Sequence, residues 1–233
     1  MNICVIPARG GSKRILRKNI KDFLGKPIIA YSIEVALKSN CFDKVIVSTD
    51  DDEIAVIAKK YGAKVPFIRP NELSNDYAGT IPVIKHAIEW LEENNNTIDN
   101  VCCLYATAPF IQSRTISQAF QQFQESKANY CFSVTSFAFP IQRAIKLTEE
   151  NRVNMFFPEN FEIRSQDLEE AYHDAGQFYW GKAQAFKDGL SIFSEVSSPY
   201  ILPRYLVQDI DSTEDWIRAE AMYKVLKETD VLP

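Results

Sequence analysis

Apolar and polar positions alternate with two different periods along the first half of the chain. Short runs rich in β-branched residues, which predict strands, are followed by longer runs with apolar residues at helical spacing. The predicted strands are residues 3–7, 44–48, 65–68, 101–105 and 130–134, and the predicted helices are residues 28–38, 53–61, 81–93 and 115–125. Such alternation is typical of a parallel sheet with crossover helices. The sequence therefore predicts a doubly wound α/β fold with a mostly parallel sheet.

The helical period disappears between about residues 135 and 172. This segment contains prolines and several aromatic residues, among them Phe137, Phe139 and Phe156. Linkers are seldom so aromatic, so we interpret residues 135–172 as an excursion inserted into a single domain that spans residues 1–233. Beyond it, residues 177–180 predict a strand, residues 183–187 a short helix, residues 200–203 a further strand-like run, and residues 207–211 an extended segment before a final helix, 213–228.

Composition narrows the range of functions. The 233 residues are 46% hydrophobic, which is enough to fill the core of one domain. A net charge of −5 argues against a nucleic-acid or membrane-surface partner. The chain shows neither a secretory signal pattern nor an apolar run of about 18 residues. Its five cysteines lie mostly in apolar runs without C-x-x-C spacing. We expect a cytoplasmic protein with reduced cysteines, without zinc.

A strongly basic loop follows the first predicted strand. Residues 8–19, ARGGSKRILRKN, contain five basic and no acidic residues. Loops at the carboxyl ends of strands are where open α/β sheets bind ligands. Gly10 and Gly11 permit close approach of the backbone to a polyanion, whose charge the cations can neutralise. The loop matches neither the P-loop nor the dinucleotide-binding pattern. The alternative is a solvated basic loop, but position and charge together favour phosphate binding.

Two carboxylates stand at i and i+2 near the other end of the chain. On an extended segment, Asp209 and Asp211 point to the same side, and such a pair can hold Mg²⁺ together with water and phosphate. The alternative is that Asp211 or Ser212 caps the helix that follows. The more conspicuous acidic cluster, residues 50–53, is interpreted as the start of a helix, where acids complement the dipole. His86 is interpreted as a packed helix residue.

Five motifs occur together in this order: the ARGGSKR…KN loop, VSTD at 47–50, RPNEL at 69–73 followed by Asp76, ATAP at 106–109, and DID at 209–211. In this combination the chain resembles the cytidylyltransferases that make CMP-activated nonulosonic acids, the CMP-sialic acid synthetase family. The resemblance covers essentially the whole chain. It implies a Rossmann-like nucleotidyltransferase fold and an enzyme that transfers CMP from CTP to the anomeric hydroxyl of an acidic nine-carbon sugar, releasing pyrophosphate.

The resemblance also implies roles for individual residues. Asp209 and Asp211 would bind a catalytic Mg²⁺, and residues 135–172 would form the interface of a homodimer. Catalytic roles would fall to Arg9, Lys18 and Asp211. The nucleotide would be bound by Arg9, Gly10, Gly11, Ser12, Lys18, Asn19, Arg69, Ala78 and Thr80.

The residues expected to face the sugar depart from the sialic acid pattern. Tyr105 stands where sialic acid synthetases usually have glutamine, and residues 165–167 and 172–177 lack an arginine-containing version that ends in Asn-Gly-Ala. They resemble the pseudaminic acid branch of the family instead. The expected sugar-binding residues are Tyr105, Gln166, His173, Gln177 and Tyr179.

Several alternatives remain open. Within the class, the product could be a CMP-sialic, CMP-legionaminic or CMP-Kdo sugar. A non-catalytic nucleotide-binding module is a second possibility, although binding alone does not require the paired carboxylates. An NAD-dependent enzyme is a third, against which the missing G-x-G-x-x-G counts.

Overall fold

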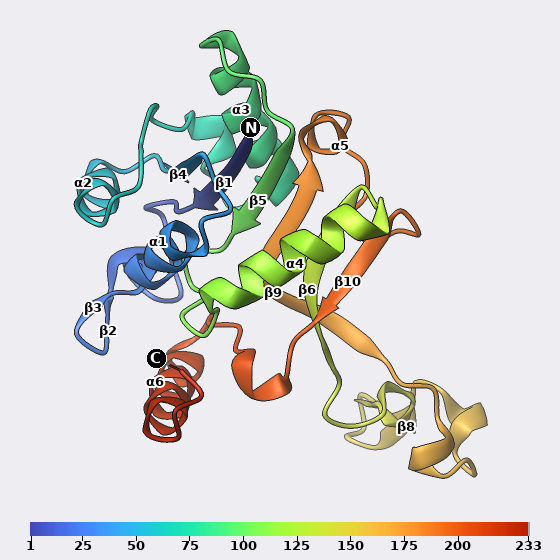
Figure 1. Cartoon of the computed structure of the whole chain (residues 1–233). Helices are drawn as coiled ribbons and strands as arrows, with labels where there is room; N and C mark the ends of the chain where they lie inside the picture. Colours follow the sequence, from blue (N-terminus) through green and yellow to red (C-terminus); the bar gives the residue numbers. More distant parts are fainter. Residues whose placement is uncertain (233) are drawn as a thin grey trace.

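A six-stranded mixed sheet runs through the computed structural model, which describes residues 1–232 (Figure 1). In spatial order its strands are β10 (Ser197–Ile201), β6 (Tyr130–Ser136), β9 (Tyr172–Lys182), β5 (Asn100–Leu104), β1 (Asn2–Pro7) and β4 (Lys44–Ser48). Strand β1 is parallel to β4 and β5, and β10 is parallel to β6, whereas β9 is antiparallel to both of its neighbours. The prediction of a mostly parallel sheet is confirmed, with β9 as the exception.

Helices cover both faces of the sheet. They are α1 (Ile28–Ser39), α2 (Asp52–Lys60), α3 (Thr80–Glu93), α4 (Ser113–Ser126) and α5 (Ala183–Lys187). Buried side chains of α1, α2 and α4 share one core cluster, and those of α3 and α5 share another. In β1, Cys4 and Ile6 belong to the first cluster while Ile3 and Val5 belong to the second. Burial on both faces explains the continuous apolar runs of the strands, and the doubly wound fold is confirmed.

The last helix, α6 (Thr213–Glu228), packs on a small hairpin of β2 (Asp22–Phe23) and β3 (Lys26–Pro27). In this third core cluster the rings of Phe23 and Trp216 meet edge to face, with 5.5 Å between their centroids. Ser212 caps α6 through a capping box with Asp215, which fixes the start of the helix. The packing of α6 thereby positions the acidic residues that directly precede it.

The predicted strand at residues 65–68 is wrong. Only Lys64 bridges to Ile46, and the residues after it form a loop. Pro66 and the nearby Pro70 explain this difference, because proline cannot donate to a strand ladder. The strand-like run predicted at residues 200–203 overlaps β10, which begins and ends earlier, at Ser197–Ile201.

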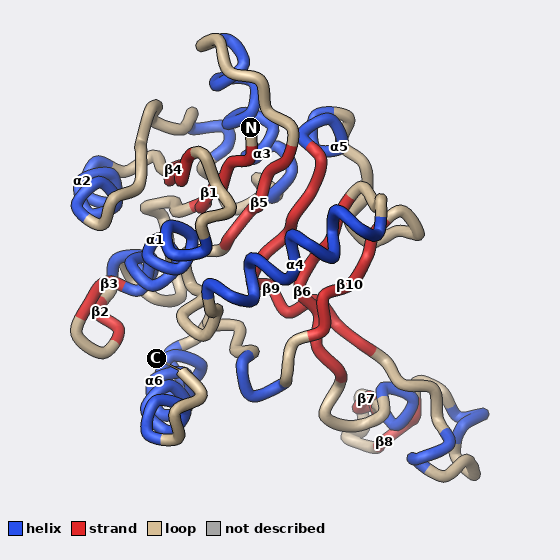
Figure 2. Tube along the Cα trace, in the orientation of Figure 1, coloured by secondary structure: helices blue, strands red, loops and turns tan. Residues whose placement is uncertain are grey.

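The chain leaves the sheet along β6 and returns along β9. Between them, residues 137–171 lie away from the sheet as a separate lobe (Figure 2). The lobe contains a hairpin of β7 (Ile145–Leu147) and β8 (Val153–Met155) and short 3₁₀ turns. Large apolar side chains on it are more than half exposed: Phe139, Ile145, Leu147, Val153, Phe156 and Phe161. The lobe therefore presents apolar surface that it does not bury within one chain.

The five cysteines are free thiols, and four of them are buried in the sheet: Cys4, Cys102, Cys103 and Cys131. Burial raises the pKa of the Cys4 thiol, so this group stays protonated and packs as an apolar side chain. In the part of the chain that the structure describes, no helix combines the length and the apolarity needed to cross a bilayer.

Candidate active site

Two cavities lie beyond the carboxyl ends of β1 and β5 and share Tyr105 in their walls. We call the first, of about 280 Å³, the loop cavity; it is lined by the basic loop, Arg69, residues 78–80 and Asp211. We call the second, of about 640 Å³, the β9 cavity; it is lined by residues 173–176, Tyr179 and residues 207–209. Carboxyl ends of strands are where an open α/β sheet binds ligands. A site for two adjacent substrates follows from this arrangement.

One contact from a distant segment and one within the loop itself fix the basic loop in place. The backbone N–H of Gly10 donates to Asp50 Oδ1 at 2.9 Å, and Asn19 Nδ2 donates to the carbonyl of Arg9 at 2.9 Å. A Cβ atom on Gly10 would lie 2.7 Å from Asp51 Oδ2, so a larger residue there would have to displace the Asp51 side chain. Gly11 has open space around it. The loop is thus preorganised before any ligand binds.

The acidic residues 50–53 have two roles. Asp51 caps α2 by accepting from the backbone N–H of Ile54 at 2.9 Å, which confirms the interpretation as a helix start. Asp51 also accepts two hydrogen bonds from the guanidinium of Arg17, which contacts Glu53 as well. Arg17 has a left-handed backbone with φ of 55°, a conformation that its ion pairs help to hold. Sequence reasoning missed this second role.

Arg69 is a buried cation on the wall of the loop cavity, with 4% of its surface exposed. Its Nη2 atom lies 3.7 Å from Asp50 Oδ1, but neither Nε nor Nη2 makes a hydrogen bond within residues 1–232. Burial lowers the pKa of Arg69. Buried donors without acceptors cost free energy, and the positive charge of Arg69 favours a negatively charged ligand in the loop cavity.

The acidic pair meets the basic loop at the junction of the two cavities. Lys18 Nζ donates to the carbonyl of Ile210 at 2.7 Å and lies 3.1 Å from Asp211 Oδ1, while Arg14 Nη2 lies 2.9 Å from Asp211 Oδ2. Because Ser212 is the cap of α6, Asp211 is not needed as one. Asp211 lines the loop cavity and Asp209 the β9 cavity.

The surroundings of the acidic pair fit a divalent cation. Burial and the nearby charge of Asp211 raise the pKa of Asp209. Carboxylate oxygens are the ligands that Mg²⁺ prefers, and one or two usually suffice when a substrate phosphate completes the shell. A cation between Asp209 and Asp211 would relieve their repulsion. Arg14, which lies at the surface, would then have to leave Asp211.

Three of the five residues expected to contact the sugar line the β9 cavity: Tyr105, His173 and Tyr179. Gln177 does not, because it is buried and its Nε2 donates to the carbonyl of Leu206 at 2.7 Å. Gln166 does not either, since it lies exposed in a 3₁₀ turn of the lobe. In this conformation of one chain, neither glutamine can contact a ligand in the β9 cavity.

Asp76, to which the sequence analysis gave no role, joins the basic loop to the segment of residues 69–80. Asp76 pairs with Arg9 at 2.8 Å and with Lys13 at 2.6 Å.

The β9 cavity contains three further charged residues that were not predicted: Asp174, Arg204 and Arg218. Of these three, only Asp174 lies in a segment expected to face the sugar, residues 172–177. Its position on the same predicted strand region as Tyr179 could have marked it as a site residue.

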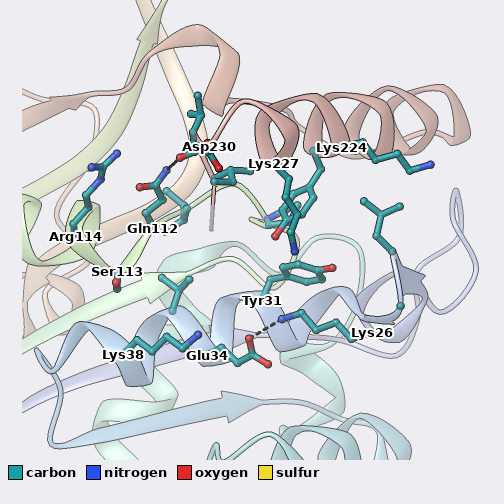
Figure 3. A pocket seen from close by; sticks show the side chains of 18 of the residues that line it. Lys26, Tyr31, Glu34, Lys38, Gln112, Ser113, Arg114, Lys224, Lys227 and Asp230 are labelled. Carbon is teal, nitrogen blue, oxygen red and sulfur yellow. Dashed lines mark hydrogen bonds and ion pairs between the residues drawn. The ribbon is translucent and has the colours of Figure 1, made fainter.

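A third and larger cavity, of about 1040 Å³, lies between α1, α6 and the start of α4 (Figure 3). Lys26 and Glu34 are paired at 2.6 Å on its wall, and Lys224 and Lys227 reach it from α6. None of the predicted site residues lines it. Size alone therefore does not identify the site, and we base the candidate site on the convergence of the basic loop and the acidic pair.

The fold and the site define a nucleotide-binding α/β protein that acts on phosphates. The chain matches the profile of the family described as Cytidylyltransferase over residues 3–213. It therefore belongs to the cytidylyltransferase family.

Similar proteins share nearly the full length of the chain. A pseudaminic acid cytidylyltransferase of Campylobacter jejuni is 52% identical over 228 residues, 98% of each chain. The CMP-N,N'-diacetyllegionaminic acid synthase of Legionella pneumophila is 32% identical, covering 97% of each chain. A solved CMP:2-keto-3-deoxy-manno-octonic acid synthetase matches with a TM-score of 0.69 at 17% identity, over 96% of this chain and 98% of the other. This last likeness supports the fold.

Proposed function

We propose that this protein transfers CMP from CTP to the anomeric hydroxyl of pseudaminic acid and releases pyrophosphate. The full-length relative of Campylobacter jejuni with 52% identity is the observation that carries the choice of sugar. Two cavities that share Tyr105 support a reaction between two substrates held side by side. The Legionella relative keeps legionaminic acid as the second candidate, at the lower identity of 32%.

In the proposed reaction, the anomeric oxygen forms a bond to the α-phosphorus while the bond from that phosphorus to the bridging oxygen breaks. The anomeric hydroxyl gives up its proton to water, and pyrophosphate leaves with the bridging oxygen. Alignment and neutralisation of charge are what this chemistry needs from a protein. Arg9, Ser12, Lys18 and Asn19 would hold the phosphates, and Arg69, Ala78 and Thr80 the nucleoside. Lys18 and Arg9 would also stabilise charge that grows on the leaving pyrophosphate.

Asp209 and Asp211 would hold Mg²⁺ at the junction of the cavities. The ion, when bound, would neutralise phosphate charge and help to align the reacting groups. Lys18 contacts Asp211 and the carbonyl between the two acids, so it would fix the orientation of this segment. Tyr105, His173 and Tyr179 would line the sugar site.

We further propose a homodimer formed through the lobe of residues 137–171. The exposed apolar side chains of the lobe, such as Leu147 and Phe156, support this proposal. Monomeric proteins rarely leave large apolar patches open to water.

The test is pyrophosphate release with CTP, Mg²⁺ and a panel of nonulosonic acids at equal concentration. We expect turnover of pseudaminic acid, with kcat/KM about 100-fold or more above that of N-acetylneuraminic acid. A pocket that merely has to reject an added hydroxyl commonly discriminates by only about 100-fold, and misplaced amides and ring hydroxyls should add to this. Replacing CTP by UTP or ATP is the control. Comparable kcat/KM for both sugars would contradict the choice of sugar but not the cytidylyl transfer.

A further inference from the structure

A strap of residues 70–79 connects Arg69 to the start of α3, and both of its ends border the loop cavity. Both ends are also held, because the backbone N–H of the buried Arg69 donates to the carbonyl of Thr49 at 2.7 Å, and Thr80 begins α3. Between the ends, the residues of the strap are exposed or half-buried, and their side chains form hydrogen bonds within it. Within residues 1–232, only Asp76 forms ion pairs between the strap and another segment. The strap is therefore supported at both ends without Asp76.

Asp76 holds two cations of the basic loop from outside the loop cavity. Its Oδ1 atom lies 2.8 Å from Arg9 Nη2, and its Oδ2 atom lies 2.6 Å from Lys13 Nζ. Arg9 and Lys13 line the loop cavity, whereas Asp76 does not. Hydrogen bonds from Lys13 and Arg9 lower the pKa of Asp76, so its carboxylate is charged at neutral pH. Asp76 is thus placed to orient the two cations without occupying the space where they would meet a ligand.

Arg9 and Lys13 keep most of their donors free for a ligand. A guanidinium has five N–H donors and an ammonium group has three, and the ion pairs with Asp76 leave the rest of them available. The Lys13 side chain is 78% exposed, and a long exposed side chain loses rotamer freedom when a ligand orders it. Because Asp76 holds the cations before a ligand binds, it lowers this cost.

We infer that Asp76 is a positioning residue that holds Arg9 and Lys13 toward the β- and γ-phosphates of CTP. Those two phosphates leave together as pyrophosphate, and Arg9 is one of the two residues proposed to stabilise their charge. Lys13 thereby joins the residues that bind phosphate. The inference rests on the proposed function for the identity of the nucleotide.

Two simpler roles for Asp76 predict different results. If Asp76 only fastened the strap, its loss would disturb Ala78 and Thr80, which are proposed to hold the nucleoside, and would weaken the binding of CTP and CMP alike. If Asp76 only added negative charge near the cavity, its loss would strengthen the binding of a polyanion. Positioning of the cations predicts weaker binding of CTP alone, because CMP lacks the β- and γ-phosphates.

Calorimetric titration with CTP and with CMP, in the presence of Mg²⁺, distinguishes these roles. Asp76→Asn keeps the size of the side chain and removes its charge. We expect this variant to bind CTP about 3- to 10-fold more weakly, within the range that the loss of two exposed ion pairs gives. Its affinity for CMP should stay close to that of wild type, and its melting temperature should not change.

Glu72→Gln is the matched control. Glu72 lies exposed on the same strap and forms no ion pair within residues 1–232, so its loss changes the charge near the cavity without freeing a cation. We expect the affinity of Glu72→Gln for CTP to equal or exceed that of wild type. A loss of affinity as large as that of Asp76→Asn would show that the ion pairs are not the cause.

A double-mutant cycle tests whether Asp76 acts through the cations. Lys13→Ala removes one of them. The double variant Lys13→Ala/Asp76→Asn should bind CTP more tightly than the product of the two single effects predicts, since the ion pair between the two residues can be lost only once. Single effects that multiply would overturn the inference.

The titrations also separate the inference from the proposed function. An unchanged or stronger affinity of Asp76→Asn for CTP would overturn the inference, and so would an equal weakening of CTP and CMP binding. A wild type that binds CTP no more tightly than CMP would instead contradict phosphate binding by the basic loop, and with it the proposed function. Neither measurement needs the sugar, so both are independent of the choice of pseudaminic acid.

Discussion

Asp209 and Asp211 are two residues apart and have different surroundings. Asp211 is paired with Lys18 and Arg14, whereas the carboxylate of Asp209 has no side-chain partner among residues 1–232. The pKa of Asp209 is raised by burial and by Asp211. The charge of Asp211 is therefore already balanced by two basic side chains, whereas that of Asp209 is not. The proposed Mg²⁺ site uses both acids.

We predict that Asp209→Asn and Asp211→Asn each lower kcat at least about 100-fold, more than the loss of an outer-shell partner of a metal site commonly does. Each change removes a charge from the proposed Mg²⁺ site while keeping the size of the side chain. Steady-state rates at saturating CTP and Mg²⁺, with melting temperatures alongside, measure the effect. Asp50→Asn is the comparison. It should cost far less, since asparagine can still accept from Gly10, and an equal loss would mean that the wrong acids were chosen.

Some site residues directly follow a strand, and the sequence predicts that these lie close together. The reason is that the carboxyl ends of parallel strands meet at one edge of the sheet. The sequence could not place Gln177. The backbone N–H groups of Gln177 and Phe178 both donate to Ser133 Oγ, at 3.3 and 3.2 Å, where the register between β6 and β9 shifts. Such an irregularity re-aims side chains. The family resemblance suggested Gln177 as a sugar-binding residue, but in the structure its side chain donates to the carbonyl of Leu206.

At the scale of elements, the α-helices and four of the six strands of the main sheet could be predicted to within two residues, and the direction of β9 could not. Hydrophobic periodicity identifies a strand but carries no information about whether its neighbours are parallel. Strand β9 runs antiparallel because the lobe that begins at the end of β6 returns the chain beside it. A long connection without a helical period was the available signal, since a parallel return needs a crossover.

The start of α2 carries the second prediction. Arg17 lowers the pKa of Asp51 by hydrogen bonding to its carboxylate. A lowered pKa stabilises the fold above the ordinary value of about 3.9, and this contribution is lost as the pH falls through the folded pKa. We expect Asp51→Asn, which keeps the cap, to lower the free energy of unfolding by about 1–3 kcal/mol at pH 7.

Urea denaturation at neutral and acidic pH measures this effect. The difference between wild type and Asp51→Asn should shrink as the pH falls below about 4, where the wild-type carboxylate takes up its proton. Asp52→Asn is the control, because Asp52 lies in the same helical turn but is exposed. A difference that stays constant with pH, or an equal loss in Asp52→Asn, would rule out the ion pair as the cause.

At the scale of the whole molecule, the homodimer that we propose depends on the lobe of residues 137–171. Its apolar side chains lie far from the core clusters of the sheet, so they stabilise the folded monomer little. Leu147 in β7 is 67% exposed and Val153 in β8 is 62% exposed. Paired strands that carry such residues on an exposed lobe are suited to pack against a second copy, where the apolar area is removed from water.

The third prediction concerns this assembly. Wild type should sediment with twice the mass of one chain, and Leu147→Asp should shift it to the monomer, because a charge buried in an apolar interface is costly. Val56→Asp is the matched control: Val56 in α2 is 66% exposed but lies outside the lobe, so the dimer should persist. Analytical ultracentrifugation across a range of concentrations separates the two masses. A monomeric wild type would rule out the proposed dimer, and a Leu147→Asp variant that remains dimeric would place the interface elsewhere on the molecule.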